Sequence, residues 1–520
     1  MSEVQTEPVS YDDLPYEGVA LPSTHPQHLA MVARLFGMDT APAGRCRVLE
    51  LGCGTGGNIV PMAQELPGSS FTGIDLSAVE IAEARRWARI LGVSNLALEQ
   101  MDIRDVDAGF GEFDYIIAYG VYSWVPEHVR DSLWRICREN LAPEGVAMIS
   151  YNVFPGWHLR MGVRQMMLYH SLRFPAEERT QQALGLLEFL RSGTEALDGR
   201  LKDIGIYHDV LEREAGRLRE KPSAYLAHEH LSGANDPLYF SEFVTRAAAA
   251  GLNYLADADF GSMLTSSLPP TVAEQVEAVA SDRVSSEQYM DFLTNRTFRE
   301  SLLCHAEVPL TMQIPGSALQ HLHMASAASF LEPGHERYER ERPKIRSVAG
   351  TIVSVKTAAA VAALQVLTGT WPQAMTFEAL LEETAKSLGQ TFETADVERL
   401  ANTLVTLFAM KVVEFRTEPV RCVAASRAGE RPLASEVARL QAVVGPAVTN
   451  LRHDTVDLDL ECRAILPLLD GTRTRSELAS VLNTVLEADG QPGAYPTAEA
   501  LSVAVDGAIE RLGRLSLLAG

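Results

Sequence analysis

The chain of 520 residues is poor in cysteine, in aromatic residues and in basic residues relative to acidic ones. Its six cysteines are scattered with no C-x-x-C pair and no fixed spacing, so we expect reduced, mostly buried thiols. No uninterrupted apolar run approaches the ~18 residues that a membrane helix needs, and the first ten residues have neither a basic nor an apolar segment. We therefore expect a cytoplasmic protein with no membrane partner.

The excess of acidic residues limits the classes of partner. The chain has 45 Lys and Arg against 68 Asp and Glu, a net charge of −23. This balance argues against nonspecific binding to nucleic acid or anionic membranes and mildly favours a basic partner, although solubility alone also explains it. The length suggests two to four domains, and 46% hydrophobic residues are enough for conventional cores.

The segment VLELGCGTGGN, residues 48–58, is the one around which the chain is organised. An apolar run enters a turn with four glycines, which predicts a buried strand leading into the glycine loop of a nucleotide-type cofactor site. Gly52, Gly54 and Gly57 fit the dinucleotide pattern. With Gly56 instead of Gly57, and with Glu50 ahead of them, the same residues fit E-x-G-x-G-x-G, the pattern of S-adenosylmethionine (SAM) sites. Glu50 favours SAM, because a carboxylate would repel a pyrophosphate but attract the ammonium of a methionine moiety.

Acidic residues follow the next two predicted strands. Asp75 ends the strand FTGID, about 20 residues beyond the loop, where a carboxylate can accept both ribose hydroxyls; a helix cap is the alternative. Asp102 and Ile103 end the third strand, where one can accept from the adenine amine and the other can stack on the ring. The predicted cofactor residues are Glu50, Gly52, Gly54, Gly56, Asn58, Asp75, Leu76, Asp102, Ile103, Tyr119 and Tyr16.

Aromatic residues gather in the loops after the fourth and fifth predicted strands, although only 7% of the chain is aromatic. Aromatic walls exclude water, and their faces attract a sulfonium or a cationic acceptor. Core packing is the alternative, and because strand side chains alternate, only part of the set is expected to face a pocket. The candidates for orienting the acceptor are Tyr119, Tyr122, Trp124, Tyr151, Trp157 and His158, of which His158 could instead act as a general base.

Changes in pattern along the chain predict its domain organisation. Strands and helices alternate with short connections over residues 1–165, which indicates parallel βαβ units with ligands at the carboxyl ends of the strands. Residues 166–240 have amphipathic helical patterns and are predicted to be an inserted helical layer. Helix and strand patterns over residues 241–310 predict a return to the sheet. Residues 311–345 are predicted to be a linker, because EPGHERYERERPKIRS is rich in charge and proline.

Residues 346–520 show a weakly repeated pattern of helix, glycine turn and helix, which indicates winged-helix-like units. Residues 345–520 contain 16 Lys and Arg against 21 Asp and Glu, a net charge of −5, so binding to a phosphate backbone is not expected. We expect this region to cover or recruit the acceptor, and its removal to spare cofactor binding.

No metal site is predicted. The neighbouring residues His228, Glu229 and His230 are of metal-ligating types, but they lack H-E-x-x-H spacing. Three consecutive residues also cannot share one face of a helix.

Several of these segments carry a family resemblance. ELGCGTGGN, Asp75 and Asp102 resemble the motifs of class I SAM-dependent methyltransferases. YDDLPY, SWVP, SYNVFPGW, FVTRAAAAGLNYLADA and YMDFLTNRTFRESLLCH resemble methyltransferases that bear a methyltransferase regulatory domain, a group that includes rickettsial protein lysine methyltransferases acting on outer-membrane proteins. The resemblance implies an α/β fold with a Rossmann-like seven-stranded sheet, a helical middle insertion and a mainly helical, winged-helix-like C-terminal region.

The acceptor is less well defined by the sequence. The fourth strand leads into Ala118, Tyr119, Gly120 and Val121 instead of the N-P-P-Y of many amide and amine methyltransferases, which disfavours an amide nitrogen. An apolar, aromatic pocket suits a lysine stem and would lower the pKa of its amine. We therefore expect protein lysine N-methylation, with a possible homodimer. The alternatives are methylation of a small molecule or peptide natural product, and SAM sensing without catalysis.

Overall fold

The computed structural model describes residues 18–219, 221–312, 314–331, 343–488, 495 and 497–519. The predicted cofactor residue Tyr16 lies outside these ranges, as do residues 332–342 of the predicted linker.

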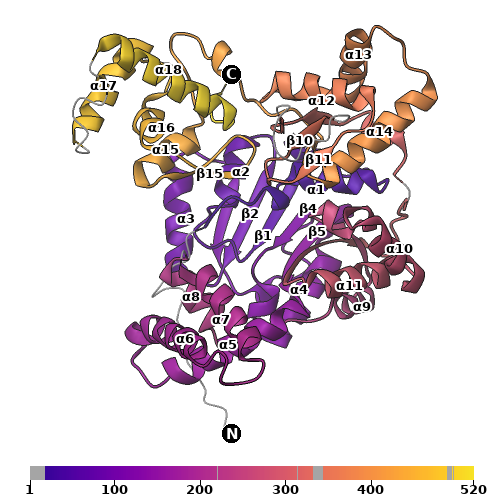
Figure 1. Cartoon of the computed structure of the whole chain (residues 1–520), viewed down its shortest axis with the longest axis vertical. Helices are drawn as coiled ribbons and strands as arrows, with labels where there is room; N and C mark the ends of the chain where they lie inside the picture. Colours follow the sequence, from indigo (N-terminus) through magenta and orange to yellow (C-terminus); the bar gives the residue numbers. More distant parts are fainter. Residues whose placement is uncertain are drawn as a thin grey trace.

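A seven-stranded sheet forms the centre of the molecule (Figure 1). Its strand order is β3-β2-β1-β4-β5-β7-β6, and β7 runs antiparallel to both of its neighbours. The strands are β1 (Arg47–Leu51), β2 (Ser70–Asp75), β3 (Leu96–Gln100), β4 (Phe113–Ala118), β5 (Leu141–Asn152), β6 (Leu252–Asp257) and β7 (Phe298–His305). The central strands are apolar runs because helices cover both of their faces. The predicted Rossmann-like seven-stranded fold is confirmed.

The two faces of the sheet pack against different helices, and we call them the α1 face and the α4 face. The core on the α1 face includes α1 (Pro26–Leu35), α2 (Ile59–Glu65) and α3 (Ala78–Ile90). The core on the α4 face includes α4 (Glu127–Glu139) and α9 (Phe240–Ala249). Since strand side chains alternate, each residue at a strand end belongs to one of these two faces.

The chain leaves the sheet after β5 and forms a helical layer before it returns. This layer consists of α5 (Gly156–Ser171), α6 (Arg179–Ala196), α7 (Ile204–Arg219) and α8 (Ser223–His230), and it has its own small core (Figure 1). The predicted helical insertion is therefore present. Two more helices, α10 (Pro270–Val279) and α11 (Arg283–Thr294), connect β6 to β7.

The C-terminal region contains two modules. In the first, β8 (His323–Ala325) lies between β12 (Met375–Thr376) and β13 (Glu414–Arg416), with α12 (Ala358–Thr370), α13 (Phe377–Leu388) and α14 (Thr394–Ala409). A small sheet of β9 (Ser329–Phe330), β10 (Lys344–Arg346) and β11 (Ile352–Ser354) adjoins it. The second module consists of α15 (Glu436–Val444), β14 (Ala447–Thr449), β15 (Thr455–Asp457), α16 (Leu460–Ile465), α17 (Arg475–Ala488) and α18 (Ala498–Arg514).

The two modules are attached to the sheet in different ways. The core of the α1 face continues into α12, α13 and α14, so the first module shares a core with the sheet. The second module has a separate core. Strands β8 and β9 fall within the range predicted as a linker, and they are held there because each pairs with a strand that comes later in the chain.

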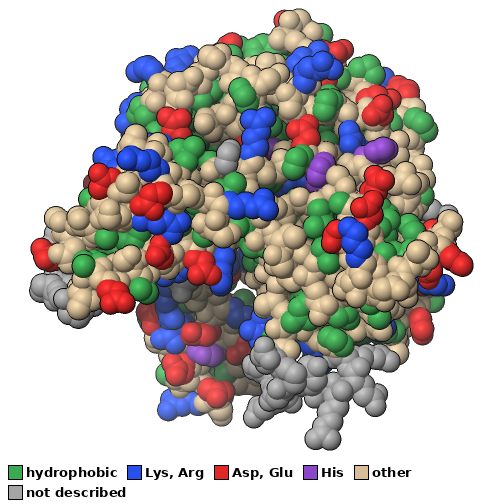
Figure 2. Space-filling model, turned by 90° about the horizontal axis from the view of Figure 1, so that it is seen from above, with side chains coloured by type: hydrophobic (Ala, Val, Ile, Leu, Met, Phe, Trp, Pro, Cys, Tyr) green, Lys and Arg blue, Asp and Glu red, His purple; other side chains and the backbone are tan. Residues whose placement is uncertain are grey.

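The surface over the C-terminal modules carries mixed charge. Lys and Arg side chains lie interspersed with Asp and Glu side chains across this face (Figure 2). Among the helices of the described ranges, none combines the length and the apolar character needed to cross a membrane.

Candidate functional site

The glycine loop follows β1 at the carboxyl end of the sheet. Gly52, Gly54 and Gly56 have φ of 77°, 51° and 78°, which is the left-handed region that favours glycine. At Gly56 an added Cβ would lie 2.8 Å from Val60 Cγ2 and 2.9 Å from Ala84 Cβ. Glycine is therefore required both for the turn and for the close packing of the loop on the two helices that follow it.

Glu50 lies beneath this loop and has one oxygen without a partner. The side chain is 4% exposed, and its Oε1 accepts a 2.7 Å hydrogen bond from Asn58 Nδ2. Its Oε2 is buried and has no hydrogen-bond partner among the described residues. Burial raises the pKa of Glu50 to about 8, and the nearby Asp75 carboxylate adds to this shift. An unpaired buried carboxyl oxygen is costly, so this atom fits a ligand ammonium.

Asp75 is held in a fixed orientation at the end of β2. One of its oxygens accepts from the Gly54 amide at 2.9 Å and the other accepts from the Ser77 amide at 2.9 Å. Ser77 in turn caps α3. A carboxylate at the end of the strand that follows the glycine loop is the group type that can accept ribose hydroxyls. The next side chain, Leu76, is 69% exposed and can cover an adenine ring.

The third predicted acid lies beyond β3 and is already paired. Asp102 accepts from the Arg104 amide at 2.9 Å and forms a 2.7 Å ion pair with the Arg104 guanidinium. Arg104 lowers the pKa of Asp102. Ile103 is half-buried beside it. The structure thus brings Asp75, Leu76, Asp102 and Ile103 to the same edge as the glycine loop, with Asp102 a charged acceptor there at neutral pH.

An N-terminal segment, residues 18–24, covers the glycine loop. The Gly18 amide donates to Thr55 Oγ1 at 3.1 Å. The Leu21 amide and the Thr24 hydroxyl each lie 3.1 Å from Asn58 Oδ1. Asn58 therefore connects this segment to Glu50. The sequence analysis did not identify these contacts.

Asn58 also contacts the second C-terminal module. His453 Nε2 lies 2.8 Å from Asn58 Oδ1, and the His453 ring is fully buried beside the ring of His25. Burial lowers the pKa of His453 well below its usual value, so the imidazole is neutral and Nε2 donates. His453 was missed by the sequence analysis, because no local pattern links it to a residue 395 positions earlier.

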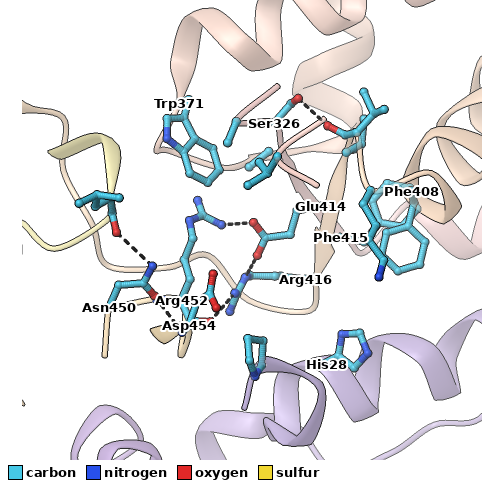
Figure 3. Close-up of a pocket in the computed structure, with 18 of the residues that line it drawn as sticks. His28, Ser326, Trp371, Phe408, Glu414, Phe415, Arg416, Asn450, Arg452 and Asp454 are labelled. Atoms are coloured by element: carbon cyan, nitrogen blue, oxygen red, sulfur yellow. Dashed lines mark hydrogen bonds and ion pairs between the residues drawn. The ribbon is translucent and has the colours of Figure 1, made fainter. Parts of the chain in front are cut away.

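A pocket of about 390 Å³ lies beside His453, where the two C-terminal modules meet α1 (Figure 3). Glu414 forms ion pairs with both Arg416 and Arg452 in its wall. Arg416 Nη1 also donates to Gln27 Oε1 of α1 at 3.2 Å. These contacts tie the His453 loop to α1 and hence hold the imidazole on Asn58.

Two of the predicted acceptor residues require correction. Tyr122 and Tyr151 are 0% and 1% exposed, and both pack on Phe243 of α9 in the core of the α4 face. The Tyr151 hydroxyl lies 2.8 Å from Ser301 Oγ. They belong to the core because strand and turn geometry directs them to the face away from α1, a direction that the sequence did not reveal.

The other four candidates occupy different surroundings. Tyr119 is half-buried on the α1 face, with its ring edge-on to Phe298 at 5.7 Å. Trp124 is half-buried and lies 6.1 Å from the ring of Trp157, which is 2% exposed. His158 is exposed; it stacks on Phe154 at 4.0 Å, and its Nε2 lies 3.1 Å from the Tyr239 hydroxyl. Tyr119 is thus the candidate on the same face as Glu50.

The His228 to His230 segment has a local role. His230 Nε2 lies 3.1 Å from Glu214 Oε1 within the helical layer. In the part of the chain that the structure describes, no group of three His, Cys, Asp or Glu side chains is placed to hold a metal ion.

Comparisons with known families match three separate parts of the chain. Residues 48–145 match the family described as "Methyltransferase domain", and residues 222–305 match "Predicted methyltransferase regulatory domain". Residues 430–491 match "PKMT, C-terminal winged helix domain". The second match covers α9, β6, α10, α11 and β7, so the regulatory domain supplies two strands of the central sheet.

Solved structures and curated relatives agree with these matches. PKMT2 from Rickettsia typhi, whose structure is solved, has 28% sequence identity with the present chain. The match covers 97% of the present chain and 100% of the PKMT2 chain, with a TM-score of 0.84. A second structure of PKMT2, in complex with AdoHcy, has a TM-score of 0.83 at 27% identity. The uncharacterized protein RP789 of Rickettsia prowazekii is 43% identical over 58% of this chain, and the match spans 54% of that relative.

A shorter relative is covered almost completely. The uncharacterized protein RP028 of Rickettsia prowazekii is 33% identical to the present chain. The match covers 47% of the present chain and 95% of RP028. The chain therefore belongs to the class I SAM-dependent methyltransferases that combine a methyltransferase domain, a methyltransferase regulatory domain and a PKMT winged-helix domain.

Proposed function

We propose that the protein transfers a methyl group from SAM to the side-chain amine of a protein lysine. The observation that carries the proposal is the match of the whole fold, both C-terminal modules included, to PKMT2, a protein lysine methyltransferase with a solved AdoHcy complex. Shared fold alone does not fix chemistry. The charges at the glycine loop add independent support.

The residues of the glycine loop fit this cofactor. SAM, when bound, supplies a methyl group on a sulfonium, which makes the methyl carbon electrophilic. Glu50 would receive the methionine ammonium on its unpaired Oε2, and the three glycines would let the backbone approach the ligand. Asp75 would accept the ribose hydroxyls. Leu76 and Ile103 would enclose the adenine, and Asp102 would accept from its amine.

Methyl transfer from SAM depends mainly on how the enzyme positions the two reactants. An in-line displacement requires that the acceptor nitrogen, the methyl carbon and the sulfur be held collinear in a site that excludes water, which can supply several kcal/mol of the barrier. Tyr119 is on the face and edge where the acceptor would approach. Trp124 and His158 are proposed to border the entrance, with the buried Trp157 packed behind Trp124. We propose that the enzyme works in the cytoplasm; light scattering would determine whether it is a homodimer.

The proposal is tested by incubating the purified protein and labelled SAM with a lysate of cells that lack it. We expect label in the protein fraction, recovered as methyl-lysine after hydrolysis and amino-acid analysis. Label confined to low-mass products would instead identify a small-molecule or peptide methyltransferase. AdoHcy binding without any transfer would identify a SAM sensor.

A further inference from the structure

Glu300 lies in a row of side chains that crosses the sheet at its carboxyl edge. In the register of the sheet, Ala118 pairs with Ile149 and Ser150 pairs with Glu300. Tyr119 is the next residue after Ala118, so it is level with Ser150. Side chains that are level in adjacent strands point to the same face. Tyr119, Ser150 and Glu300 therefore form one row on the α1 face, the face that also holds Glu50.

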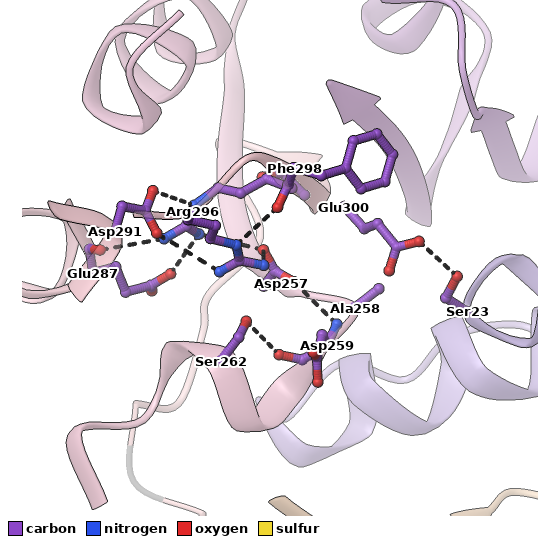
Figure 4. Close-up of polar contacts among 12 residues, drawn as sticks. Ser23, Asp257, Ala258, Asp259, Ser262, Glu287, Asp291, Arg296, Phe298 and Glu300 are labelled. Atoms are coloured by element: carbon purple, nitrogen blue, oxygen red, sulfur yellow. Dashed lines mark hydrogen bonds and ion pairs between the residues drawn. The ribbon is translucent and has the colours of Figure 1, made fainter. Parts of the chain in front are cut away.

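The N-terminal segment connects Glu300 to the cofactor residues. Ser23 Oγ donates to Glu300 Oε1 at 3.0 Å (Figure 4). Leu21 and Thr24, in the same turn of chain, bind Asn58. Asn58 in turn donates to Glu50, so the proposed methionine site and Glu300 lie on either side of one short turn.

Two aromatic rings lie on the same face of the sheet as Glu300. Phe298 lies two residues before Glu300 in β7, so its side chain is on the same face, and its ring packs edge-on against Tyr119. Phe298, Tyr119 and Glu300 are all half-buried. A carboxyl group beside two partly exposed rings suits a side chain with an apolar stem and a cationic end.

Glu300 differs from the other carboxylates near the start of β7. Asp291 and Glu287 pair with Arg299 at 2.8 Å and 2.9 Å, and Asp257 pairs with Arg296 at 2.9 Å. Glu300 instead accepts from a neutral hydroxyl, and in Figure 4 it points away from the arginines toward Ser23. Its charge is therefore available to a ligand.

The surroundings of Glu300 keep its pKa near neutrality. Burial raises that pKa to about 7, and the carboxylates of Asp257 on β6 and Asp259 beyond it add to the rise. The Ser23 hydroxyl and Arg296 act in the opposite direction. His28 of α1 is half-buried, and its Nε2 lies 2.9 Å from the Ala258 carbonyl oxygen. Desolvation lowers the pKa of His28, so it adds no positive charge. A Glu with a pKa near 7 is suited to accept a proton at physiological pH.

We propose that Glu300 binds the ammonium of the acceptor lysine and removes its proton before methyl transfer. This inference rests on the proposed lysine methyl transfer and names the residue that prepares the nucleophile. Proton transfer converts the ammonium and the carboxylate into a neutral amine and a carboxylic acid. The nitrogen lone pair then forms the new N–C bond as the C–S bond of SAM breaks, which leaves neutral AdoHcy and a methylammonium.

The test compares full-length wild type with Glu300→Gln, Glu300→Asp, Ser23→Ala and a matched control, Glu144→Gln. Glu144 is an exposed residue of β5 at the opposite end of the sheet. The acceptor is the heat-inactivated protein fraction of a lysate from cells that lack the protein. Initial rates with labelled SAM are measured from pH 6 to 10, and AdoHcy affinity is measured by calorimetry.

We expect Glu300→Gln to lower kcat/KM about 100-fold at pH 7.5, the lower end of the usual contribution of a general base, with partial recovery toward pH 10 as lysine ionises unaided. Glu300→Asp should restore part of the rate. Ser23→Ala should move the acid limb of the pH profile upward, because the lost hydrogen bond no longer favours the carboxylate. AdoHcy affinity should stay within about twofold, and Glu144→Gln should match wild type.

Three results would overturn the inference. A Glu300→Gln variant with the wild-type pH profile and rate would do so while leaving lysine methylation intact. If that variant does not fold, as judged by its thermal transition, an unshifted profile in Ser23→Ala would do the same. Wild-type label found in small molecules alone would overturn the proposed function itself, and Glu300 would lose its substrate.

Discussion

The cofactor half of the sheet edge, at β1, β2 and β3, differs from the acceptor half, at β4, β5 and β7. In the cofactor half, local backbone geometry and direct hydrogen bonds fix where each predicted site residue lies. Gly56 has a left-handed backbone conformation, and Asp75 accepts a hydrogen bond from the glycine loop. In the acceptor half, a chemically similar set of aromatic residues divides between the two faces, with Tyr119 on one and Tyr122 on the other. Residue type therefore identifies a site only where local geometry also fixes the direction of the side chain.

The largest expected effect tests this division. Tyr122→Ala should lower the free energy of unfolding by about 3–5 kcal/mol, because it leaves a cavity among Phe243, Trp134 and Tyr151. His158→Ala, at an exposed position in the same half, should change it by less than about 0.5 kcal/mol. Urea denaturation of both variants measures the difference. Equal losses would mean that Tyr122 is not part of the core.

The second prediction concerns the pH dependence of stability in the cofactor half. The pKa of Glu50 is about 8 in the folded protein and about 4.5 when unfolded, so the folded state holds the extra proton between these values. Unfolding free energy should therefore fall as pH rises from 4.5 through 8, by about 2–4 kcal/mol from Glu50 alone.

Glu50→Gln removes this titrating group and should therefore weaken the dependence of the unfolding free energy on pH. Urea denaturation at pH 5, 6.5 and 8 without ligand would measure this change. Because an ammonium ligand favours the ionised carboxylate, AdoHcy binding at pH 7 should also release protons in wild type and not in the variant. Parallel pH slopes for the two proteins would contradict the buried, protonated state of Glu50.

A smaller effect is expected at the glycine loop. Gly56→Ala forces a left-handed backbone on alanine and places its Cβ against Val60 and Ala84, so AdoHcy should bind about 1–3 kcal/mol more weakly. Gly162→Ala, in α5 with open space around it, is the matched control and should bind normally. Calorimetry with AdoHcy distinguishes them. Unchanged affinity in Gly56→Ala would show that this loop does not hold the ligand.

The smallest effect links the cofactor half to the C-terminal modules. His453→Ala leaves Asn58 Oδ1 without one of its donors, and should weaken AdoHcy binding by about 1–2 kcal/mol. His305→Ala, a half-buried histidine at the far end of β7, serves as the control. Normal affinity in His453→Ala would support the prediction from sequence that the C-terminal region is dispensable for cofactor binding.

Much of the fold was predictable because its signals are local. The apolar strands, the capping Ser77 and the glycine loop each constrain a short stretch of backbone, and the predicted seven-stranded sheet with a helical insertion is confirmed. The direction of Tyr122 and Tyr151 was not predictable, because it depends on the turn after β4 and on which face of the sheet each strand residue meets. Strand β8 was hidden in a predicted linker because its partners, β12 and β13, lie far along the chain.

The predicted cofactor residues remain a prediction at the level of individual contacts. Glu50 and Asp75 could be selected because each has a fixed position relative to the glycine loop, one just before it and one at the end of the next strand. His453 and Glu300 could not. His453 reaches the site from the second C-terminal module. Glu300 is near the start of β7, and this start lies at the carboxyl edge only because β7 runs antiparallel to β5.

The contact between His453 and Asn58 also has a consequence for biosynthesis. A ribosome completes the glycine loop early, but it must add 395 further residues before the imidazole that binds Asn58 is made. Since domains fold in order of their synthesis, the nascent methyltransferase domain waits with an incomplete cofactor site. The cofactor site therefore gains this last contact only once nearly the whole chain has been translated.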